Sequence, residues 1–200
     1  MANYFVIIGA YLLGSLSFAV IVSRCMGMPD PHSYGSGNPG ATNVLRSGRK
    51  SAAALTLLGD ALKGWLAVWL CCHYQTSWHL SHYSIAAVAV AVLVGHMWPI
   101  FLKFKGGKGV ATALGVLLAL SWPTALICAA VWLIIAFGFK VSSLAALIAT
   151  IISPLVAWWF IPWPSWIIAI IIIDILVLYR HKSNITKLLN GQESKIGHSN

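Results

Sequence analysis

Long apolar runs recur along the whole chain and are separated by short polar segments. The candidate membrane spans are approximately Tyr4–Val22, Ala52–Cys72, Ile85–Leu102, Ala111–Phe137, Leu144–Phe160 and Ser165–Tyr179. A helix needs about 20 predominantly apolar residues to cross the hydrocarbon core of a bilayer, and most of these runs approach that length. The pattern therefore predicts an all-α integral membrane protein built as a helix bundle.

The composition supports this interpretation. The 200-residue chain is 59% hydrophobic and 8% charged, with a mean hydropathy of +0.83. Soluble domains are about 45–50% apolar and about 25% charged, so this chain could not cover its surface with polar groups in water. A soluble enzyme domain, a secreted disulfide scaffold and a disordered chain are excluded. The first run is not a cleaved signal peptide, because its first positive charge, Arg24, follows it.

The positive charges between the spans indicate their orientation. With the N-terminus outside, residues 23–51 and 103–110 lie on the cytoplasmic side, and the outer loop 73–84 carries no Lys or Arg. Ala111–Phe137 is ambiguous, because Ser121–Thr124 interrupts it. If it crosses twice, or dips in and returns, the later Lys and Arg residues also fall inside. We therefore predict about seven transmembrane helices, some short or broken, with the C-terminus inside. Two short spans and a re-entrant hairpin both remain open for this segment.

Three predicted cytoplasmic segments, residues 28–50, 103–112 and 180–195, differ from ordinary loops. The first contains GSGNPGATN at 35–43, followed by Arg46. Its opening matches G-x-G-x-x-G but lacks the βαβ context of a dinucleotide site. Glycines let backbone amides approach an anion, and the neighbouring residues add polar groups. The candidate phosphate-binding residues here are Ser36, Gly37, Asn38, Thr42, Asn43 and Arg46. A glycine-rich turn between two spans is the alternative.

The second segment is a basic, glycine-rich loop, FKGGKGVAT at 104–112, that leads into a helix. It is not a Walker A motif, which requires G-x-x-x-x-G-K-[ST] after a strand. Free amides and the helix dipole at a helix start favour an anion. The candidate ligands are Lys105, Gly106, Gly107 and Lys108, with His96 close by at the inner end of the third span. Cytoplasmic anchoring explains the lysines but not the glycines.

The third segment begins with Arg180-His181-Lys182-Ser183-Asn184 and continues to Glu193. On one helix leaving the membrane, Arg180 and Asn184 would share a face, as would His181 and Asn184. A basic juxtamembrane stop signal is the alternative.

Ionisable groups inside the spans are functional candidates. Asp60 and Lys63 are three positions apart, so an ion pair is the simplest interpretation, although Lys63 could instead be directed at a bound anion. Asp174 in the last span is expected to pair with a neighbouring helix. The four acids of the chain form no cluster for Mg²⁺, so neither a metal nor a cofactor is predicted. The basic residues are spread over bundle loops, which argues against a nucleic-acid partner.

Together GSGNPGATN…R, FKGGKGVAT and RHxxNI…GxE resemble the bacterial acyl-phosphate:glycerol-3-phosphate acyltransferase family, the PlsY type, over essentially the whole chain. The resemblance implies one membrane-embedded domain, residues 1–200, in the bacterial inner membrane with its active site at the cytoplasmic face. It implies acyl transfer from acyl phosphate to glycerol 3-phosphate, which gives lysophosphatidic acid and phosphate beside the membrane lipid. A transporter or channel for phosphorylated metabolites is the alternative from a different class.

The resemblance also implies a set of site residues. The expected catalytic residues around the two phosphates are Ser36, Arg46, Lys108, His181 and Asn184. Thr42, Asn43 and the backbone of Gly106 and Gly107 are expected beside them. Further candidates for substrate binding are Gly37, Asn38, Lys63, His96, Lys105 and Glu193. Two departures from the family are Lys187, where Arg is commoner, and the charge of Asp174 in the last span.

The identity of the base remains open at this point. His181 is the only obvious side-chain base in the motifs. An oxygen of the acyl phosphate could instead take the hydroxyl proton. A covalent acyl-Ser36 is a weaker third option, because no His or Asp is fixed nearby in the sequence to activate the hydroxyl.

Overall fold

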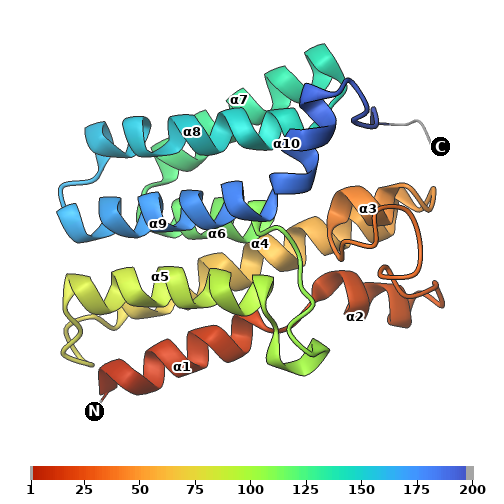
Figure 1. The fold of residues 1–200 in the computed structure, drawn as a ribbon. Helices are drawn as coiled ribbons and strands as arrows, with labels where there is room; N and C mark the ends of the chain where they lie inside the picture. The colour runs from red at the N-terminus through yellow and green to blue at the C-terminus, as the bar shows by residue number, and fades with distance from the viewer. Residues whose placement is uncertain (1, 197–200) are drawn as a thin grey trace.

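The computed structural model describes residues 2–196, and within this range the chain is helical and contains no strand. In chain order the helices are α1 (Ala2–Gly14), α2 (Phe18–Cys25), α3 (Ala41–Leu45), α4 (Lys50–His73), α5 (His82–Met97), η1 (Ile100–Leu102), α6 (Val110–Leu120), α7 (Trp122–Phe139), α8 (Ser142–Phe160), α9 (Pro164–Arg180) and α10 (Lys182–Leu189). The longer helices run back and forth as a bundle (Figure 1). The predicted all-α class is confirmed.

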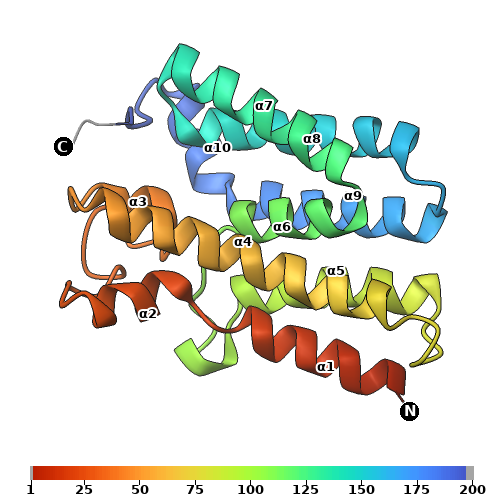
Figure 2. The same ribbon diagram turned by 180° about the vertical axis from the view of Figure 1, so that it is seen from behind.

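The bundle is held together by pairs of neighbouring helices. Helix α1 packs on α5, α4 on α6, and α7 on α8, while α9 lies between α5 and α8 (Figures 1 and 2). Among the described residues, four helical segments are long and apolar enough to cross a membrane: α4, α5 together with η1, α7, and α8. The pairs α1–α2 and α9–α10 also pass when taken together, although they bend by 45° and 59°.

The first predicted span, Tyr4–Val22, is broken between α1 and α2. Ser17 caps α2 by accepting a hydrogen bond from the Val20 amide. The break leaves the carbonyl of Leu16 outside any helix, and the Lys63 ammonium donates a 2.6 Å hydrogen bond to it. The buried lysine therefore satisfies a backbone group that a continuous helix would have paired internally.

The ambiguous segment Ala111–Phe137 forms two helices that meet at Ser121 and run in opposite directions (Figure 2). Ser121 caps α7 by accepting from the Thr124 amide, and Pro123 lies in the first turn, where no amide donor is needed. Helix α6 has 11 residues. At about 1.5 Å per residue it is roughly half as long as the hydrocarbon core is thick. It is therefore a short helix packed inside the bundle.

Glycines allow the closest helix pairs to form. A Cβ on Gly64 would lie 2.3 Å from the carbonyl oxygen of Thr112, and a Cβ on Gly115 would lie 1.9 Å from that of Ala61. Helices α4 and α6 thus approach each other through reciprocal glycines. Gly14 and Gly95 do the same for α1 and α5. Small residues at such contacts are typical of helix packing within membranes.

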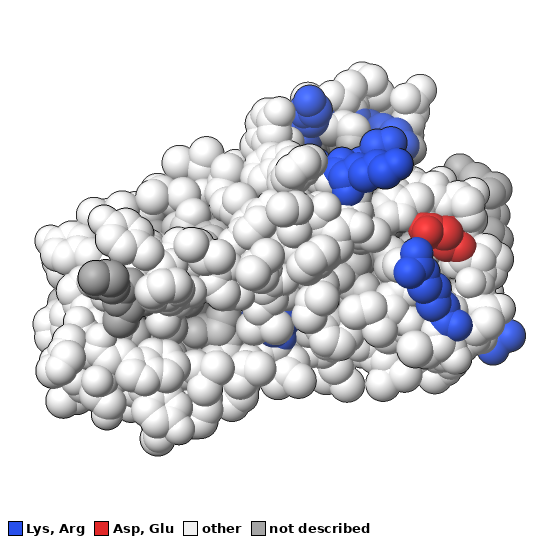
Figure 3. All heavy atoms as spheres, turned by 90° about the horizontal axis from the view of Figure 1, so that it is seen from below, with Lys and Arg blue, Asp and Glu red and all other residues white. Residues whose placement is uncertain are grey.

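The basic residues gather toward one end of the molecule. Seen from below, Lys and Arg lie mainly toward one side of Figure 3, while the opposite end shows none. The end that carries the basic residues holds the α5–α6 and α7–α8 connections together with α2, α3 and α10 (Figure 1). The arrangement agrees with the predicted positive-inside orientation, which remains a prediction.

We predict that Gly115→Ala destabilises the bundle, because the new methyl group would overlap the α4 backbone. Overpacking of this kind costs about 1–3 kcal/mol. The matched control is Gly138→Ala on α7, where an added Cβ meets nothing within 4 Å. Thermal unfolding in detergent, followed by tryptophan fluorescence, measures the effect. Equal midpoints for the two variants would contradict the proposed close contact.

Candidate active site

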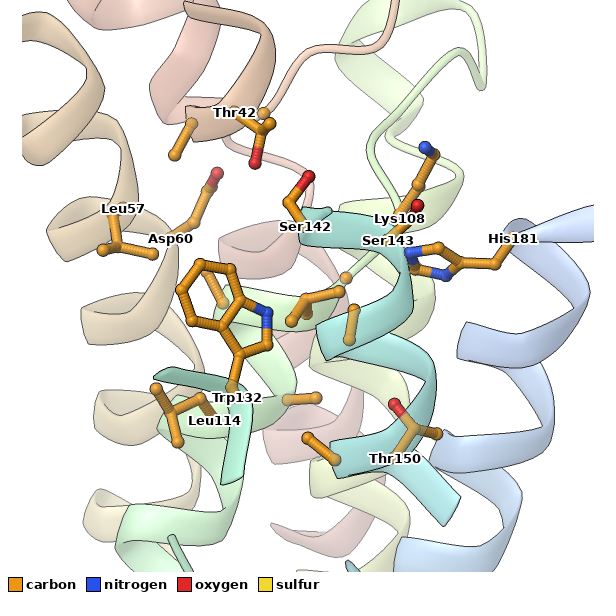
Figure 4. Close-up of a pocket in the computed structure, with 18 of the residues that line it drawn as sticks. Thr42, Leu57, Asp60, Lys108, Leu114, Trp132, Ser142, Ser143, Thr150 and His181 are labelled. Atoms are coloured by element: carbon orange, nitrogen blue, oxygen red, sulfur yellow. The ribbon is translucent and has the colours of Figure 1, made fainter. Parts of the chain in front are cut away.

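A cavity of about 400 Å³ brings the three polar segments together at the basic end of the bundle. Pockets that bind small molecules have about 300–1,000 Å³. The predicted site residues that line it are Ser36, Asn38, Thr42, Asn43, Arg46, His96, Lys108, His181, Asn184 and Glu193. Thr42, Lys108 and His181 approach it from different elements (Figure 4). The convergence predicted from the sequence therefore exists in the fold.

Asn43 organises the first segment. It is 2% exposed, and its amide nitrogen donates to the carbonyls of Pro31 at 2.8 Å and Tyr34 at 3.2 Å. Its Oδ1 accepts from the amide of Ser36 at 2.8 Å and from the Ser36 hydroxyl at 3.1 Å. Gly35 has φ +57°, and a Cβ there would lie 2.3 Å from Asn43 Oδ1. The Asn43 side chain thus uses its hydrogen bonds to fold the loop.

The glycines of the second segment pack against His96. A Cβ on Gly106 would lie 2.1 Å from the His96 carbonyl oxygen, and one on Gly107 would lie 2.3 Å from His96 Nε2. The Gly107 amide donates to the same carbonyl at 3.2 Å. That amide is therefore occupied within the protein. His96 lies close to this loop, as the sequence predicted.

Arg180 fixes the other side of this loop. Its Nε donates to the carbonyl of Gly107 at 3.1 Å, and its Nη2 donates to that of Gly106 at 2.5 Å. The guanidinium also lies 5.7 Å from the ring centroid of Trp98, within cation–π range. Arg180 is not among the site residues that the sequence predicts. A planar fork with two parallel donors suits paired carbonyls, but only the fold shows which ones it meets.

Lys108 begins a chain of hydrogen bonds across the cavity. Its ammonium donates to Asn184 Oδ1 at 2.6 Å, and Asn184 Nδ2 donates to Glu193 Oε1 at 2.8 Å. The Ser143 hydroxyl donates to the same carboxylate oxygen at 2.9 Å. Burial lowers the pKa of Lys108 to about 8, although the nearby Glu193 opposes this shift. Lys108 thus keeps a positive charge at neutral pH while it is held by a neutral acceptor.

The third segment is not one continuous helix, and this corrects the shared face predicted for Arg180 and Asn184. Helix α9 ends at Arg180, and α10 starts at Lys182 after a 59° bend. Arg180 consequently reaches the glycine loop, whereas Asn184 reaches Lys108. The bend separates the two side chains and sends each to a different partner.

His181 occupies the bend and is 2% exposed. Its Nδ1 lies 2.8 Å from the carbonyl oxygen of Val177. Since a carbonyl can only accept, Nδ1 carries the proton and Nε2 remains an acceptor. Burial is the main cause that lowers the pKa of His181 to about 4. The imidazole is therefore neutral at pH 7, and its ring is directed into the cavity (Figure 4).

The tail after α10 covers the same end. Besides the bonds of Glu193, Arg46 donates a hydrogen bond to the Ser194 hydroxyl, and the Ile196 amide donates to the Lys140 carbonyl at 2.6 Å. Residues 190–196 are tied to the bundle by these contacts, and 197–200 lie outside the described residues.

The predicted ion pair between Asp60 and Lys63 is confirmed, with Nζ 2.8 Å from Oδ1. His96 Nδ1 lies 3.5 Å from the same oxygen. Asp60 lines the cavity (Figure 4). Lys63 is 2% exposed and is not among the lining residues, so the structure does not bring it to the cavity.

Other predicted ligands also lie away from the cavity lining. Gly37, Lys105, Gly106 and Gly107 are not lining residues. The side chain of Lys105 is exposed, and its carbonyl lies 3.1 Å from His32 Nε2. Conversely, Ser142 and Ser143 line the cavity from the first turn of α8. The sequence contains one signal for this helix start: Ser142 and Ser143 follow shortly after Lys140, which ends an apolar run.

The rest of the cavity is an apolar arm that extends along the helices. Leu57 on α4, Leu114 on α6 and Trp132 on α7 form its walls (Figure 4). Small side chains leave the space open: Ala113, Ala129, Ala146 and Ala149. A cationic, polar mouth is thus continuous with an apolar arm, an arrangement suited to a molecule with both a phosphate and a hydrocarbon chain.

The sequence matches the family model for glycerol-3-phosphate acyltransferase over residues 4–191. A glycerol-3-phosphate acyltransferase of Neisseria meningitidis serogroup C (strain 053442) is 68% identical over 199 residues, and the match covers 100% of each chain. Another, from Cupriavidus necator, is 55% identical over 197 residues and covers 98% of each. The similarity includes all three polar segments.

Solved structures show the same fold. The crystal structure of PlsY, an integral membrane glycerol 3-phosphate acyltransferase, in its glycerol 3-phosphate form has a TM-score of 0.90 and 38% identity, covering 98% of this chain and 96% of that one. The lysophosphatidic acid form has a TM-score of 0.89 and 37% identity, with the same coverage. The helical arrangement is therefore that of an integral membrane protein.

We predict that Arg180→Gln loosens the glycine loop, because the paired bonds to Gly106 and Gly107 are lost. Each hydrogen bond from a charged group contributes about 1.5–3 kcal/mol, so tryptic cleavage after Lys105 and Lys108 should accelerate roughly tenfold or more. The matched control is Arg24→Gln, since Arg24 is exposed. Mass spectrometry of timed digests measures both rates, and equal rates would rule out this anchoring role.

Proposed function

The chain belongs to the glycerol-3-phosphate acyltransferase family, and on that premise we propose that it acylates glycerol 3-phosphate with acyl phosphate as the donor. The products are lysophosphatidic acid and phosphate. The observation that carries the proposal is the union of a cationic mouth and an apolar arm in one cavity. Glycerol 3-phosphate needs the cationic mouth for its phosphate. Acyl phosphate needs the cationic mouth for its phosphate and the apolar arm for its acyl chain.

We place the reaction in one membrane-embedded domain, residues 1–200, of a bacterial inner membrane. Arg46 and Lys108 line the mouth, and Lys and Arg gather toward one end of the molecule (Figure 3), which the positive-inside rule assigns to the cytoplasm. Glycerol 3-phosphate would enter from water at that face. The acyl chain would remain beside the membrane lipid throughout.

Lys108 and Arg46 are the cations that we assign to the two phosphates. Both line the cavity. Lys108 is held by the neutral side chain of Asn184, so its charge is not cancelled by direct contact with a carboxylate. Charge-assisted hydrogen bonds to phosphate oxygens are among the stronger ones in proteins. The cations would stabilise the charge that develops on the leaving phosphate.

Smaller polar groups would position the acceptor. Ser36, Asn38 and Thr42 of the first segment line the mouth, and so do His181 and Asn184 of the third. Holding a hydroxyl against an activated carbonyl supplies much of the rate enhancement in such a reaction. Asn43, Gly106 and Gly107 would contribute by shaping the loops. Glu193 would hold Asn184 in place.

The low pKa of His181 bears on the identity of the base. An imidazole with a pKa of about 4 is a weak base at neutral pH, where general catalysis works best with a pKa near the operating pH. We therefore propose that His181 Nε2 accepts a hydrogen bond from the glycerol hydroxyl and orients it. The proton would then pass to the leaving phosphate.

The bond changes balance without a further reactant. The glycerol oxygen attacks the acyl carbonyl carbon, and a carbon–oxygen ester bond forms. The bond between that carbon and the phosphate oxygen breaks, with its electron pair passing to the phosphate. The hydroxyl proton ends on a phosphate oxygen. Ser36 donates to Asn43 Oδ1 rather than to a base, so we propose direct transfer without an acyl-serine.

The decisive experiment gives purified protein labelled glycerol 3-phosphate together with either acyl phosphate or acyl-CoA. We expect labelled lysophosphatidic acid from acyl phosphate alone. Product from acyl-CoA alone would overturn the proposed donor. Reconstituted vesicles test the transporter alternative, because uptake of the label without product would favour transport over acylation.

The pH dependence should reflect Lys108. With its pKa lowered to about 8, the ammonium is present below that pH and is lost as the pH rises through it. We therefore predict that kcat/KM, which reports the free enzyme, declines above about pH 8. Lys108→Arg keeps its charge in that range, so its weaker activity should lack this decline. Lys50→Arg, at an exposed site, should retain the decline. A flat wild-type profile up to pH 10 would contradict the assignment.

A further inference from the structure

A buried carboxyl group lies along the cavity away from the phosphate-binding mouth. Asp174 on α9 accepts a 2.6 Å hydrogen bond from the Ser153 hydroxyl on α8. Both residues are buried and both line the same cavity as Lys108. The expected pairing of Asp174 with a neighbouring helix is thus confirmed. Its partner is a neutral hydroxyl, so the pair adds a charged or strongly polar group to an otherwise apolar arm.

The position of this pair along the helices indicates its depth. At about 1.5 Å per residue, the α9 segment from Asp174 to His181 corresponds to roughly 10 Å. The α8 segment from Ser143 to Ser153 corresponds to roughly 15 Å. The hydrocarbon chains of one leaflet occupy about 15 Å, half of the core thickness. A long acyl chain that followed the arm from the mouth would therefore reach Asp174.

A proline makes this region more polar. Helix α8 continues through Pro154, which has no amide hydrogen, so the carbonyl of Thr150 lacks its usual donor within the helix. Thr150 also lines the cavity (Figure 4). We call Thr150, Ser153 and Asp174 the polar floor. It differs from the walls above it, which are formed by leucines, alanines and Trp132.

We propose that the polar floor limits the length of the acyl chain that the cavity accepts, with Asp174 as the specificity-determining residue. This inference rests on the proposed function of the cavity. A chain that ends above the floor leaves the carboxyl group and the Thr150 carbonyl in contact with water in the cavity. A longer chain displaces that water and buries the same groups against hydrocarbon, which is unfavourable. Shorter chains are therefore preferred.

The test is a competition between acyl donors of different length. An equimolar mixture of lauroyl and stearoyl phosphate is given to the protein with glycerol 3-phosphate, and the two products are quantified by mass spectrometry. Their ratio equals the ratio of the kcat/KM values and does not depend on the fraction of active enzyme. We expect the wild type to favour the lauroyl product at least tenfold.

Two variants separate polarity from size. Asp174→Val removes the polar group at similar volume, and we expect it to reduce the tenfold preference to about twofold or less. Asp174→Asn keeps a polar side chain and should retain most of the preference. Ile175→Leu is the control on the same helix, because Ile175 is 60% exposed and faces away from the cavity lining; it should behave as the wild type.

The possible failures can be distinguished. An active Asp174→Val enzyme with an unchanged product ratio overturns the inference and leaves the proposed donor intact. Equal effects of Val and Asn also overturn it, because polarity would then not be the cause. If no acyl phosphate of any length yields product, the proposed function fails and the inference fails with it.

Discussion

The hydrogen bond from the Lys108 ammonium to the Asn184 side chain joins segments that lie 76 residues apart in the sequence. It places a lysine in a partly buried position, where the ammonium needs a hydrogen-bond acceptor that does not neutralise its charge. A neutral amide is such an acceptor, whereas a directly bound carboxylate would compete with an incoming anion. Glu193 acts one step further out, through Asn184. The cationic mouth of the cavity depends on this order of partners.

Much of the polar sequence near the cavity serves to hold loops rather than to meet a ligand. Asn43 uses its hydrogen bonds on the backbone and hydroxyl groups of its own segment. Arg180 takes the carbonyls of Gly106 and Gly107. Irregular backbone at the edge of a membrane bundle leaves amides and carbonyls that must find partners in the protein. These side-chain hydrogen bonds hold the loops at the mouth in place.

The same constraint operates deeper in the bundle. Lys63 satisfies the carbonyl exposed at the break between α1 and α2 and also pairs with Asp60. Asp174 accepts a hydrogen bond from Ser153, which lies next to the proline inside α8. Lys63 therefore lies beside a break between helices, and Asp174 lies beside a proline that removes one helical hydrogen bond. This connects the breaks in the helices with the shape and polarity of the cavity.

The sequence by itself determined the membrane-embedded helical class, the boundary near Ser121, the Asp60–Lys63 pair and the three segments that converge, because hydrophobic length, capping and short spacings act locally. Tertiary structure decided the rest. The bend at His181 directs Arg180 and Asn184 to different partners, and Arg180 meets a carbonyl of a distant segment. Lys63 lies away from the cavity lining because its ammonium donates to the carbonyl of Leu16, which is also distant in the sequence. The roles of Ser143 and Arg180 likewise follow from contacts that no local pattern encodes. Which backbone groups are left unpaired, and which side chain can reach them, is settled only when the helices have packed.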